Sequence, residues 1–440
     1  MIDANILKNK FSKAIDQTDT LEKVGRITKV IGLVLESEGP KASIGEICLL
    51  KDKTGKVLSK SEIVGFKDNR ILSMVLGDIE HISPGMKIIA TGESLEVKVG
   101  DALLGRVLDG LGNPIDNKGP IATDKRRNVI SQPPNPLLRK RISEPIATGI
   151  KAIDGMLTMG KGQRVGIFSG SGVGKSTLLG MIARNTSADI NVIALIGERG
   201  REVREFLEND LGKEGLQRSI VVIATSDAPS LVRVKSALVA TSIAEYFRDR
   251  DMDVMFMMDS ATRLAMAQRE VGLTIGEPPT SKGYTPSVFA LLQKTMERAG
   301  TSEKGSITGL YTILVEGDDL NEPVSDAARG ILDGHIVLSR KLASKGHYPA
   351  IDVLESISRL KKAVTDEEHY KKTIKIQELL ATYRDAEDLI SVGAYQKGTN
   401  KKIDKAIEHI DQINDFLTQD IKETSDFDEI IEKISEITEQ

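Results

Sequence analysis

The segment Ser169–Thr177 reads Ser-Gly-Ser-Gly-Val-Gly-Lys-Ser-Thr, a glycine-rich loop that ends in lysine and hydroxyl side chains. It follows the apolar run 164–168 and precedes a stretch with helical spacing, which is the context that a phosphate-binding P-loop requires. The glycines let backbone N–H groups close around phosphate oxygens. The N-terminus of the following helix adds the positive end of its dipole. The segment therefore predicts a nucleotide triphosphate site.

Two side chains of this loop have expected roles in binding the nucleotide and its metal ion. Lys175 should reach the β- and γ-phosphates, and the Ser176 hydroxyl should ligate Mg²⁺. The strict motif has glycine where this chain has Ser169, but a residue this small should still fit. The predicted ATP-contacting residues are Gly170, Ser171, Gly172, Val173, Gly174, Lys175, Ser176 and Thr177.

A second Mg²⁺ ligand is expected at the end of a neighbouring strand. The run Val254-Met-Phe-Met-Met ends in Asp259. An aspartate here could instead cap the helix that follows, since Ser260-Ala-Thr-Arg comes next. With the P-loop in the same chain, we interpret Asp259 as the second Mg²⁺ ligand.

Hydrolysis of the bound nucleotide requires a carboxylate that orients or deprotonates water. Glu198 lies just past the apolar run 191–196, at the edge where ligands of open parallel sheets collect. Glu202 lies one turn further on and stays open as the alternative. A charge-stabilising arginine is also needed, and position alone does not choose among Arg199, Arg201, Arg263, Arg340 and Arg359.

The elements that must position these side chains lie between about residues 100 and 352. Runs that are apolar on both faces alternate there with helical stretches, which indicates a parallel sheet covered by helices. The predicted strands begin at Arg164, Asn191, Ile220, Val254 and Tyr311.

The segments on either side of this region have different sequence patterns. From 24 to 92, short β-branched runs alternate with turn residues, which predicts a small β-barrel. After about 365, spaced apolar residues predict amphipathic helices. Residues 1–22 contain only a few, widely spaced apolar residues. This segment is either a frayed terminus or a segment that binds a partner. The predicted domains are that segment, a barrel at 23–95, the nucleotide-binding domain at 96–365 and a helical domain at 366–440.

The composition of the chain limits the class of protein to which it can belong. The chain has 440 residues, 40% of them hydrophobic, and a net charge of -4, so no strong field favours nucleic acid or an anionic membrane. No apolar run approaches the roughly 18 residues that span a bilayer, and the N-terminus lacks the apolar core of a signal peptide. Cys48 has no second cysteine to pair with. A cytoplasmic protein is expected.

Several further motifs resemble the flagellar and type III secretion export ATPases, a family homologous to the catalytic and non-catalytic subunits of rotary F- and V-type ATPases. The resemblance runs from about 25 to 417 and implies a RecA-like P-loop ATPase core of α/β class with an N-terminal β-barrel and a C-terminal helical domain. The segments that carry it are 259–270, 275–279, 282–289, 334–340, 346–354 and 356–359.

The resemblance also implies roles for single residues. Glu198 matches the water-activating carboxylate, and Arg199 matches its neighbour on the γ-phosphate side. Arg263 matches another arginine of the rotary catalytic subunit. Tyr348 matches the aromatic that packs on adenine, although a plain core tyrosine is the alternative. Arg359 matches the arginine finger that enters the next subunit's nucleotide site.

In F- and V-type rings the P-loop glutamate and the finger arginine lie on different polypeptides, whereas this chain carries both. A homohexamer is therefore expected. The family implies a stator or regulator protein at the N-terminus. It also implies a coiled-coil stalk and chaperone–substrate complexes at the C-terminal helices. The expected location is the cytoplasmic face of an inner-membrane export apparatus, at its export gate.

The same sequence also bears on three other functions. A rotary ATPase subunit would need partner chains. An RNA translocase would stack bases on aromatics of its barrel, but residues 1–100 hold only Phe11 and Phe66. An inactive scaffold conflicts with the intact Lys175, Glu198 and Asp259. The stretches Gly32–Pro40 and Gly45–Cys48 resemble the flagellar branch of the family, which favours flagellar export, and injection-type secretion stays open as the alternative.

Overall fold

The computed structural model describes residues 22–315, 319 and 321–439, in two compact units that divide between Leu95 and Glu96. The predicted partner-binding segment therefore lies outside the described residues, apart from Glu22. No helix in the described ranges is long and apolar enough to cross a bilayer.

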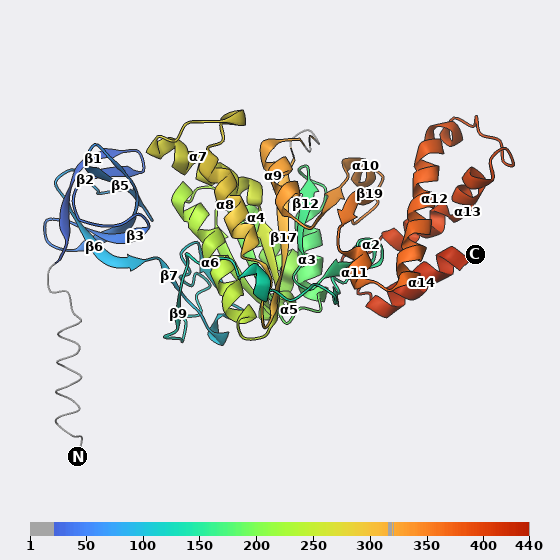
Figure 1. The fold of residues 1–440 in the computed structure, drawn as a ribbon, viewed down its shortest axis with the longest axis horizontal. Helices are drawn as coiled ribbons and strands as arrows, with labels where there is room; N and C mark the ends of the chain where they lie inside the picture. Colours follow the sequence, from blue (N-terminus) through green and yellow to red (C-terminus); the bar gives the residue numbers. More distant parts are fainter. Residues whose placement is uncertain (1–21, 316–318, 320, 440) are drawn as a thin grey trace, which may run out of the picture. The chain divides into compact units, whose positions relative to one another are not determined.

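The first unit is a closed six-stranded barrel within the described residues, with strand order β1-β2-β5-β4-β3-β6 (Figure 1). Alternating side chains fill its centre, among them Ile27, Leu35 and Ile63. Cys48 lies in the same core, and burial raises the pKa of its thiol to about 12, so it is a structural residue. The strands are β1 (Val24–Ile31), β2 (Val34–Glu38), β3 (Glu46–Lys51), β4 (Val57–Lys67), β5 (Arg70–Val75) and β6 (Lys87–Ser94).

The second unit is built on a sheet of nine strands in the described part of the chain. Its main order is β19-β18-β12-β17-β15-β13-β14-β8, and β16 (Gly300–Thr301) pairs with β17. Neighbours from β18 to β8 are parallel, whereas β19 runs antiparallel to β18. The strands are β8 (Val107–Asp109), β12 (Arg164–Ser169), β13 (Ile190–Ile196), β14 (Ser219–Ala224), β15 (Asp253–Asp259), β17 (Ser306–Leu314), β18 (Gly334–Leu338) and β19 (Ile351–Ser358).

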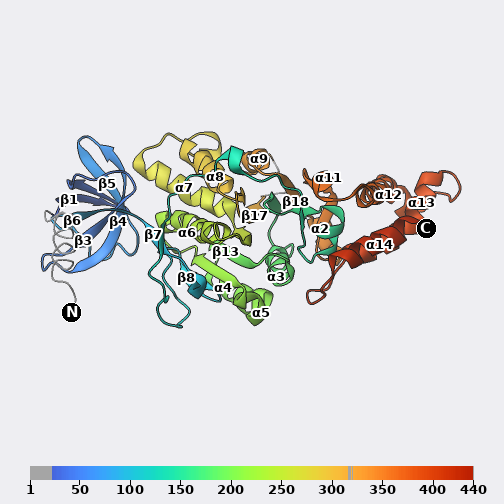
Figure 2. The same ribbon diagram turned by 60° about the horizontal axis from the view of Figure 1, so that its bottom comes forward.

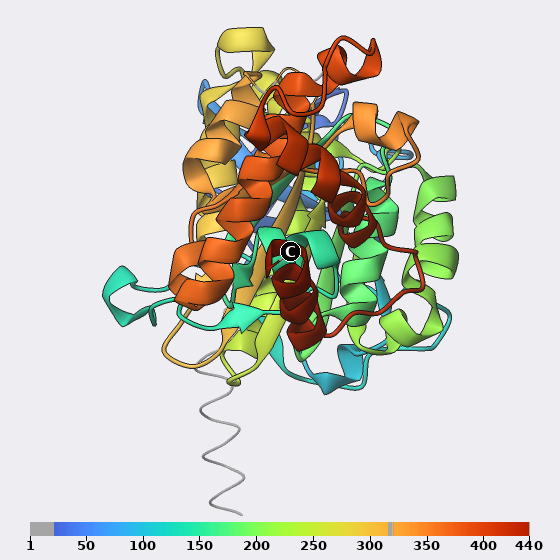
Figure 3. The ribbon, with the colours of Figure 1, turned by 90° about the vertical axis from the view of Figure 1, so that its right-hand side faces the viewer.

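Helices cover both faces of this sheet. Figures 2 and 3 show α3 (Lys175–Asn185), α4 (Gly200–Glu205) and α5 (Gly212–Gln217) on one face. On the other face lie α7 (Ala261–Ile275), α8 (Pro286–Glu297) and α9 (Pro323–Ile331). The long α6 (Ser230–Arg248) packs against β13 and α7. The strands between these layers are buried on both sides, as their continuous apolar runs predict.

Three helices complete the chain: α12 (Glu367–Ser391), α13 (Lys401–Leu417) and α14 (Phe427–Glu439). They share one core with α2 (Lys151–Met156), where a side chain on Gly155 would meet Phe416 and Ile434 at 2.8 Å. The short helix α10 (Arg340–Ser344) lies between β18 and β19, and α11 (Lys361–Val364) connects β19 to α12. The predicted fold class of barrel, α/β core and helical C-terminal domain is confirmed.

Candidate active site

The P-loop joins the end of β12 to the start of α3. Gly172 and Gly174 have φ angles of 77° and 87°, a conformation that residues with a side chain rarely adopt. A side chain on Gly174 would also lie 3.6 Å from the ring of Tyr348. The glycines therefore permit the turn and bring the loop against that aromatic ring.

Lys175 and two carboxylates meet where parallel strands end. β13 and β15 are neighbours, so the residues that follow them lie at the same edge of the sheet. The Lys175 Nζ atom lies 2.5 Å from Asp259 Oδ1 and 3.8 Å from Glu198 Oε1. Thr312 Oγ1 donates to the same Asp259 oxygen at 2.8 Å. All three predicted residues are thus brought together.

Glu198 is held by an arginine from α7. Arg263 Nε donates to Glu198 Oε1 at 3.2 Å. Burial, and then the charge of Asp259, raise the pKa of Glu198 to about 7, while Lys175 and Arg263 oppose the rise. A carboxylate with a pKa near neutrality is well matched to general base catalysis.

Gly197 makes the contact between Glu198 and Arg263 possible. Its φ angle is 72°, and an added side chain would lie 2.8 Å from Arg263 Cδ. The sequence signal for this position is a glycine between an apolar strand and a charged run, and it lies outside the P-loop motif.

The residues at this edge fit the predicted Mg²⁺. Asp259 is only 3% exposed, and its carboxylate already accepts the Lys175 ammonium, so it faces the position of a cation. Ser176 follows Lys175 directly at the start of α3. No group of three or more His, Cys, Asp or Glu that could hold a metal exists among the described residues. Mg²⁺ takes one or two protein carboxylates and completes its shell with phosphates and water, so Asp259 and the Ser176 hydroxyl would be enough to hold it.

A cavity of about 680 Å³ lies beside the P-loop, on the side of Tyr348. The Tyr348 ring is 45% exposed, so it is not a core tyrosine. Gly174, Thr177 and Leu178 line one wall. The other wall is the connection between α13 and α14, residues 418–423, which sequence reasoning missed because no local motif marks it.

Arg199 does not join the cluster, whereas Glu202 reaches it from α4: its side chain hydrogen-bonds to Glu198 and contributes to the raised pKa of Glu198. The Arg199 side chain is 76% exposed and pairs with Glu202 at 3.4 Å. Glu202 lies on α4 with a side chain that is 38% exposed. Of the two glutamates, Glu198 is therefore the one that pairs with Lys175.

Arg359 lies at the opposite edge of the sheet from the P-loop. Ser358 pairs with Gly334 at the start of β18, whereas Ser169 pairs with Leu338 at its end. The length of β18 separates the two edges by roughly 13 Å at about 3.3 Å per residue. Arg359 is exposed and donates to the Arg329 carbonyl at 3.2 Å. Arg359 thus lies about the length of β18 away from the end of the sheet that carries the P-loop.

Three family models match successive parts of the chain. The beta-barrel domain of the ATP synthase alpha/beta family matches residues 27–92, and the nucleotide-binding domain of that family matches 149–358. The T3SS EscN ATPase C-terminal domain matches 365–436.

Relatives match over nearly their full length. The chain is 54% identical to the flagellum-specific ATP synthase of Bacillus subtilis over 432 residues, which covers 96% of this chain and 97% of the relative. It is 48% identical to the type 3 secretion system ATPase of Xanthomonas euvesicatoria over 417 residues, which covers 95% and 94%.

Solved structures agree with these matches. The assembled ATPase EscN of the enteropathogenic E. coli type III secretion system superposes with a TM-score of 0.89 at 44% identity, covering 94% of this chain and 100% of that chain. EscN in complex with its central stalk EscO gives a TM-score of 0.87 at 43% identity, with the same coverage.

Proposed function

The chain belongs to the ATP synthase alpha/beta family, among the flagellum-specific and type 3 secretion ATPases, and from this premise we propose that it energises flagellar protein export by hydrolysing ATP between the subunits of a homohexameric ring. The main observation behind the proposal is that the predicted catalytic residues lie at two opposite edges of the sheet. Lys175, Glu198 and Asp259 lie at one edge, and Arg359 lies at the other. One gene product therefore supplies both halves of each interface.

The residues of the first edge perform the steps within one subunit. Lys175 exchanges its ion pair with Asp259 for the β- and γ-phosphates of ATP. Glu198 orients the attacking water and accepts its proton, and Arg263 holds that carboxylate in place. Asp259 and Ser176 would hold Mg²⁺, which would neutralise phosphate charge.

The second edge completes the neighbouring site. Arg359 of the next subunit stabilises the charge that spreads over the γ-phosphate oxygens, an effect worth about 10³–10⁵ in rate in other phosphoryl-transfer enzymes. Arg199 is exposed and would contact the same interface. Tyr348 would pack on the adenine in the cavity beside the P-loop.

Mixing two inactive variants tests this arrangement. Arg359→Ala and Glu198→Gln should each bind ATP and turn over poorly. In a mixed ring, an intact Glu198 of one subunit meets an intact Arg359 of its neighbour at about a quarter of interfaces by random mixing. Activity should therefore return, and it should depend on the ratio of the two proteins. Assembled rings, confirmed by sedimentation, with no recovery at any ratio would exclude Arg359 as a residue that acts in trans.

The partners follow from the relatives. The similarity to EscN in complex with EscO supports a central stalk protein as a partner of the C-terminal helices. We also propose a stator partner at residues 1–22, chaperone–substrate complexes, and a position at the cytoplasmic face of the export gate. A variant lacking residues 1–18 should still bind ATP but should lose the stator in a pull-down.

Injection-type secretion is the second candidate, favoured by the 48% identity to the Xanthomonas ATPase and the match to the EscN C-terminal domain. The 54% identity to the Bacillus flagellar enzyme favours the flagellar assignment. Deleting the gene in its own host decides between them. Loss of flagella, restored by the wild type and not by Arg359→Ala, supports flagellar export. Normal flagella with impaired secretion into a target cell would support the alternative.

A further inference from the structure

Gln419 is a buried amide in the connection between α13 and α14. It is only 6% exposed. Its Oε1 atom accepts the Lys151 N–H at 2.9 Å, and its Nε2 atom donates to the Gly149 carbonyl at 2.8 Å. A third bond joins Nε2 to the Glu423 carbonyl at 3.0 Å. The side chain therefore fixes this connection to the start of α2 through backbone groups that would otherwise be left unpaired.

The backbone of Gln419 also contacts Tyr348, the aromatic residue in the wall of the cavity beside the P-loop. The Gln419 N–H donates to the Tyr348 carbonyl at 2.9 Å. Tyr348 as a residue is 45% exposed in the cavity wall, so side-chain packing covers only part of it and its backbone contacts also bear on its position. The hydrogen bond to Gln419 consequently helps to fix the ring.

We infer that Gln419 is a positioning residue for the base of ATP: its side chain anchors residues 418–423 to α2, and its N–H then holds Tyr348 at the cavity beside the P-loop. This inference rests on the proposed assignment of that cavity to adenine. It predicts an effect on nucleotide affinity with little effect on the chemical step, because Gln419 touches none of Lys175, Glu198 or Asp259.

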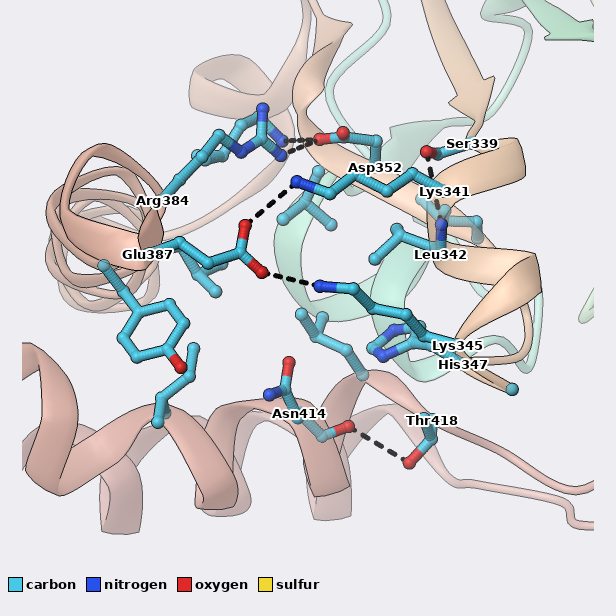
Figure 4. Close-up of a pocket in the computed structure, with 18 residues that line it drawn as sticks. Ser339, Lys341, Leu342, Lys345, His347, Asp352, Arg384, Glu387, Asn414 and Thr418 are labelled. Atoms are coloured by element: carbon cyan, nitrogen blue, oxygen red, sulfur yellow. Dashed lines mark hydrogen bonds and ion pairs between the residues drawn. The ribbon is translucent and has the colours of Figure 1, made fainter. Parts of the chain in front are cut away.

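A second attachment of the C-terminal helices supplies a matched control. Figure 4 shows Glu387 of α12 between Lys341 and Lys345, which lie on and just after α10. The ion pairs measure 2.9 Å to Lys341 and 2.6 Å to Lys345. Glu387 therefore ties the same helical bundle to the segment before Tyr348 without a hydrogen bond to Tyr348 among those described.

The test compares Gln419→Met with Glu387→Gln and Asn191→Ala. Methionine keeps the volume of glutamine but removes its hydrogen bonds. Asn191 is also a buried amide, bonded to the Ala183 carbonyl at 2.8 Å and far along β13 from Glu198, so its loss should lower stability alone. Gln419→Met should raise the Kd for a ribose-labelled fluorescent ATP and the KM for ATP about tenfold. Its kcat should stay within about twofold of the wild type, because the reacting groups are intact.

A double-mutant cycle then separates positioning from general structure. Tyr348→Ala alone should weaken binding, and adding Gln419→Met should weaken it little further if Gln419 acts through Tyr348. Full additivity, or an unchanged KM in Gln419→Met, would overturn the inference. If Tyr348→Ala leaves affinity unchanged in an active enzyme, the adenine assignment itself fails. Should Gln419→Met not fold, Gln419→Asn, which keeps the amide but shortens its reach, must show the same rise in KM.

Discussion

Arg263 Nε donates a hydrogen bond of 3.2 Å to Glu198 Oε1, and this bond joins the first turn of α7 to the loop after β13. Glu198 also faces Asp259, whose charge raises its pKa, and Lys175, whose charge lowers it. The balance leaves a carboxylate that titrates near neutral pH. The protonation state of Glu198 should therefore control turnover over the physiological range.

The pH profile of kcat/KM should have an acidic limb near pH 7, since Glu198 must be ionised to accept a proton and its pKa is about 7. Removing the Arg263 charge should raise the pKa of Glu198 further. Arg263→Ala should therefore move the limb to higher pH and lose more activity at pH 6 than at pH 8.5. Arg199→Ala is the control, because the exposed Arg199 should leave the position of the limb unchanged.

Glu198→Gln should keep Mg²⁺-dependent ATP binding and lower turnover by about 10²-fold or more, because the proton acceptor is lost. Glu202→Gln should have a much smaller effect, since the described ion pair of Glu202 is with the exposed Arg199, whereas Glu198 pairs with Lys175 and Arg263. Single-turnover assays with labelled ATP measure both. The opposite ranking of the two variants would assign the base to Glu202.

The same substitution has a consequence for stability. Because the pKa of Glu198 is raised in the fold, the native state loses stability as pH increases through about 7, where this buried carboxyl ionises. Glutamine cannot ionise. The Tm of Glu198→Gln relative to the wild type should therefore be higher at pH 8.5 than at pH 5.5, measured without nucleotide. A difference independent of pH would show that Glu198 titrates at its ordinary pKa.

Gly197→Ala should damage the site through the backbone. Its φ angle of 72° disfavours a side chain, and the added carbon would lie 2.8 Å from Arg263 Cδ. A cost of about 1–3 kcal/mol is expected from such strain, together with a large loss of turnover as Arg263 is displaced from Glu198. Gly200→Ala is the matched control three residues on, where an added carbon meets nothing within 4 Å. Equal activity of the two variants would contradict the proposed contact.

The sequence predicted the parts of the site that follow strands directly. The P-loop, Glu198 and Asp259 each lie just after an apolar run, and parallel strands bring such positions to one edge. In the strands β18 and β19, buried residues alternate with partly exposed ones. These strands therefore lack the continuous apolar runs from which the other strands were predicted. Tyr348 and Arg359 emerged from family resemblance alone, because their distance from the P-loop in sequence hides their relation to it.

Residues 418–423, which form one wall of the cavity beside the P-loop, could not be predicted from local sequence patterns. The bond between Gln419 and the Lys151 N–H spans 268 residues. Neither residue belongs to a motif, and a glutamine after a helix is ordinarily a solvated side chain. Only the tertiary packing of α13 and α14 on α2 buries Gln419, and that packing depends on long-range apolar contacts rather than on any spacing in the sequence.

The last prediction concerns the ion pairs of Glu387. Lys345 first, and then Lys341, lower its pKa to about 2 from an ordinary value of 4.5. The stability that these pairs contribute is therefore present above about pH 4.5 and is lost as pH falls toward 2. Both lysines are more than half exposed, so the contribution should be about 1 kcal/mol or less.

Glu387→Gln should accordingly lower the Tm slightly at pH 7, and part of this deficit should persist at pH 4, where an ordinary glutamate would be largely protonated. The deficit should shrink in about 1 M salt, because screening weakens exposed pairs. Glu408→Gln is the control, since its pair with Lys397 is exposed on both sides and should contribute almost nothing. Scanning calorimetry at both pH values measures the difference. A Glu387→Gln deficit that disappears at pH 4 would mean that the lysines do not hold this carboxylate ionised, and that α12 is attached to α10 by apolar packing instead.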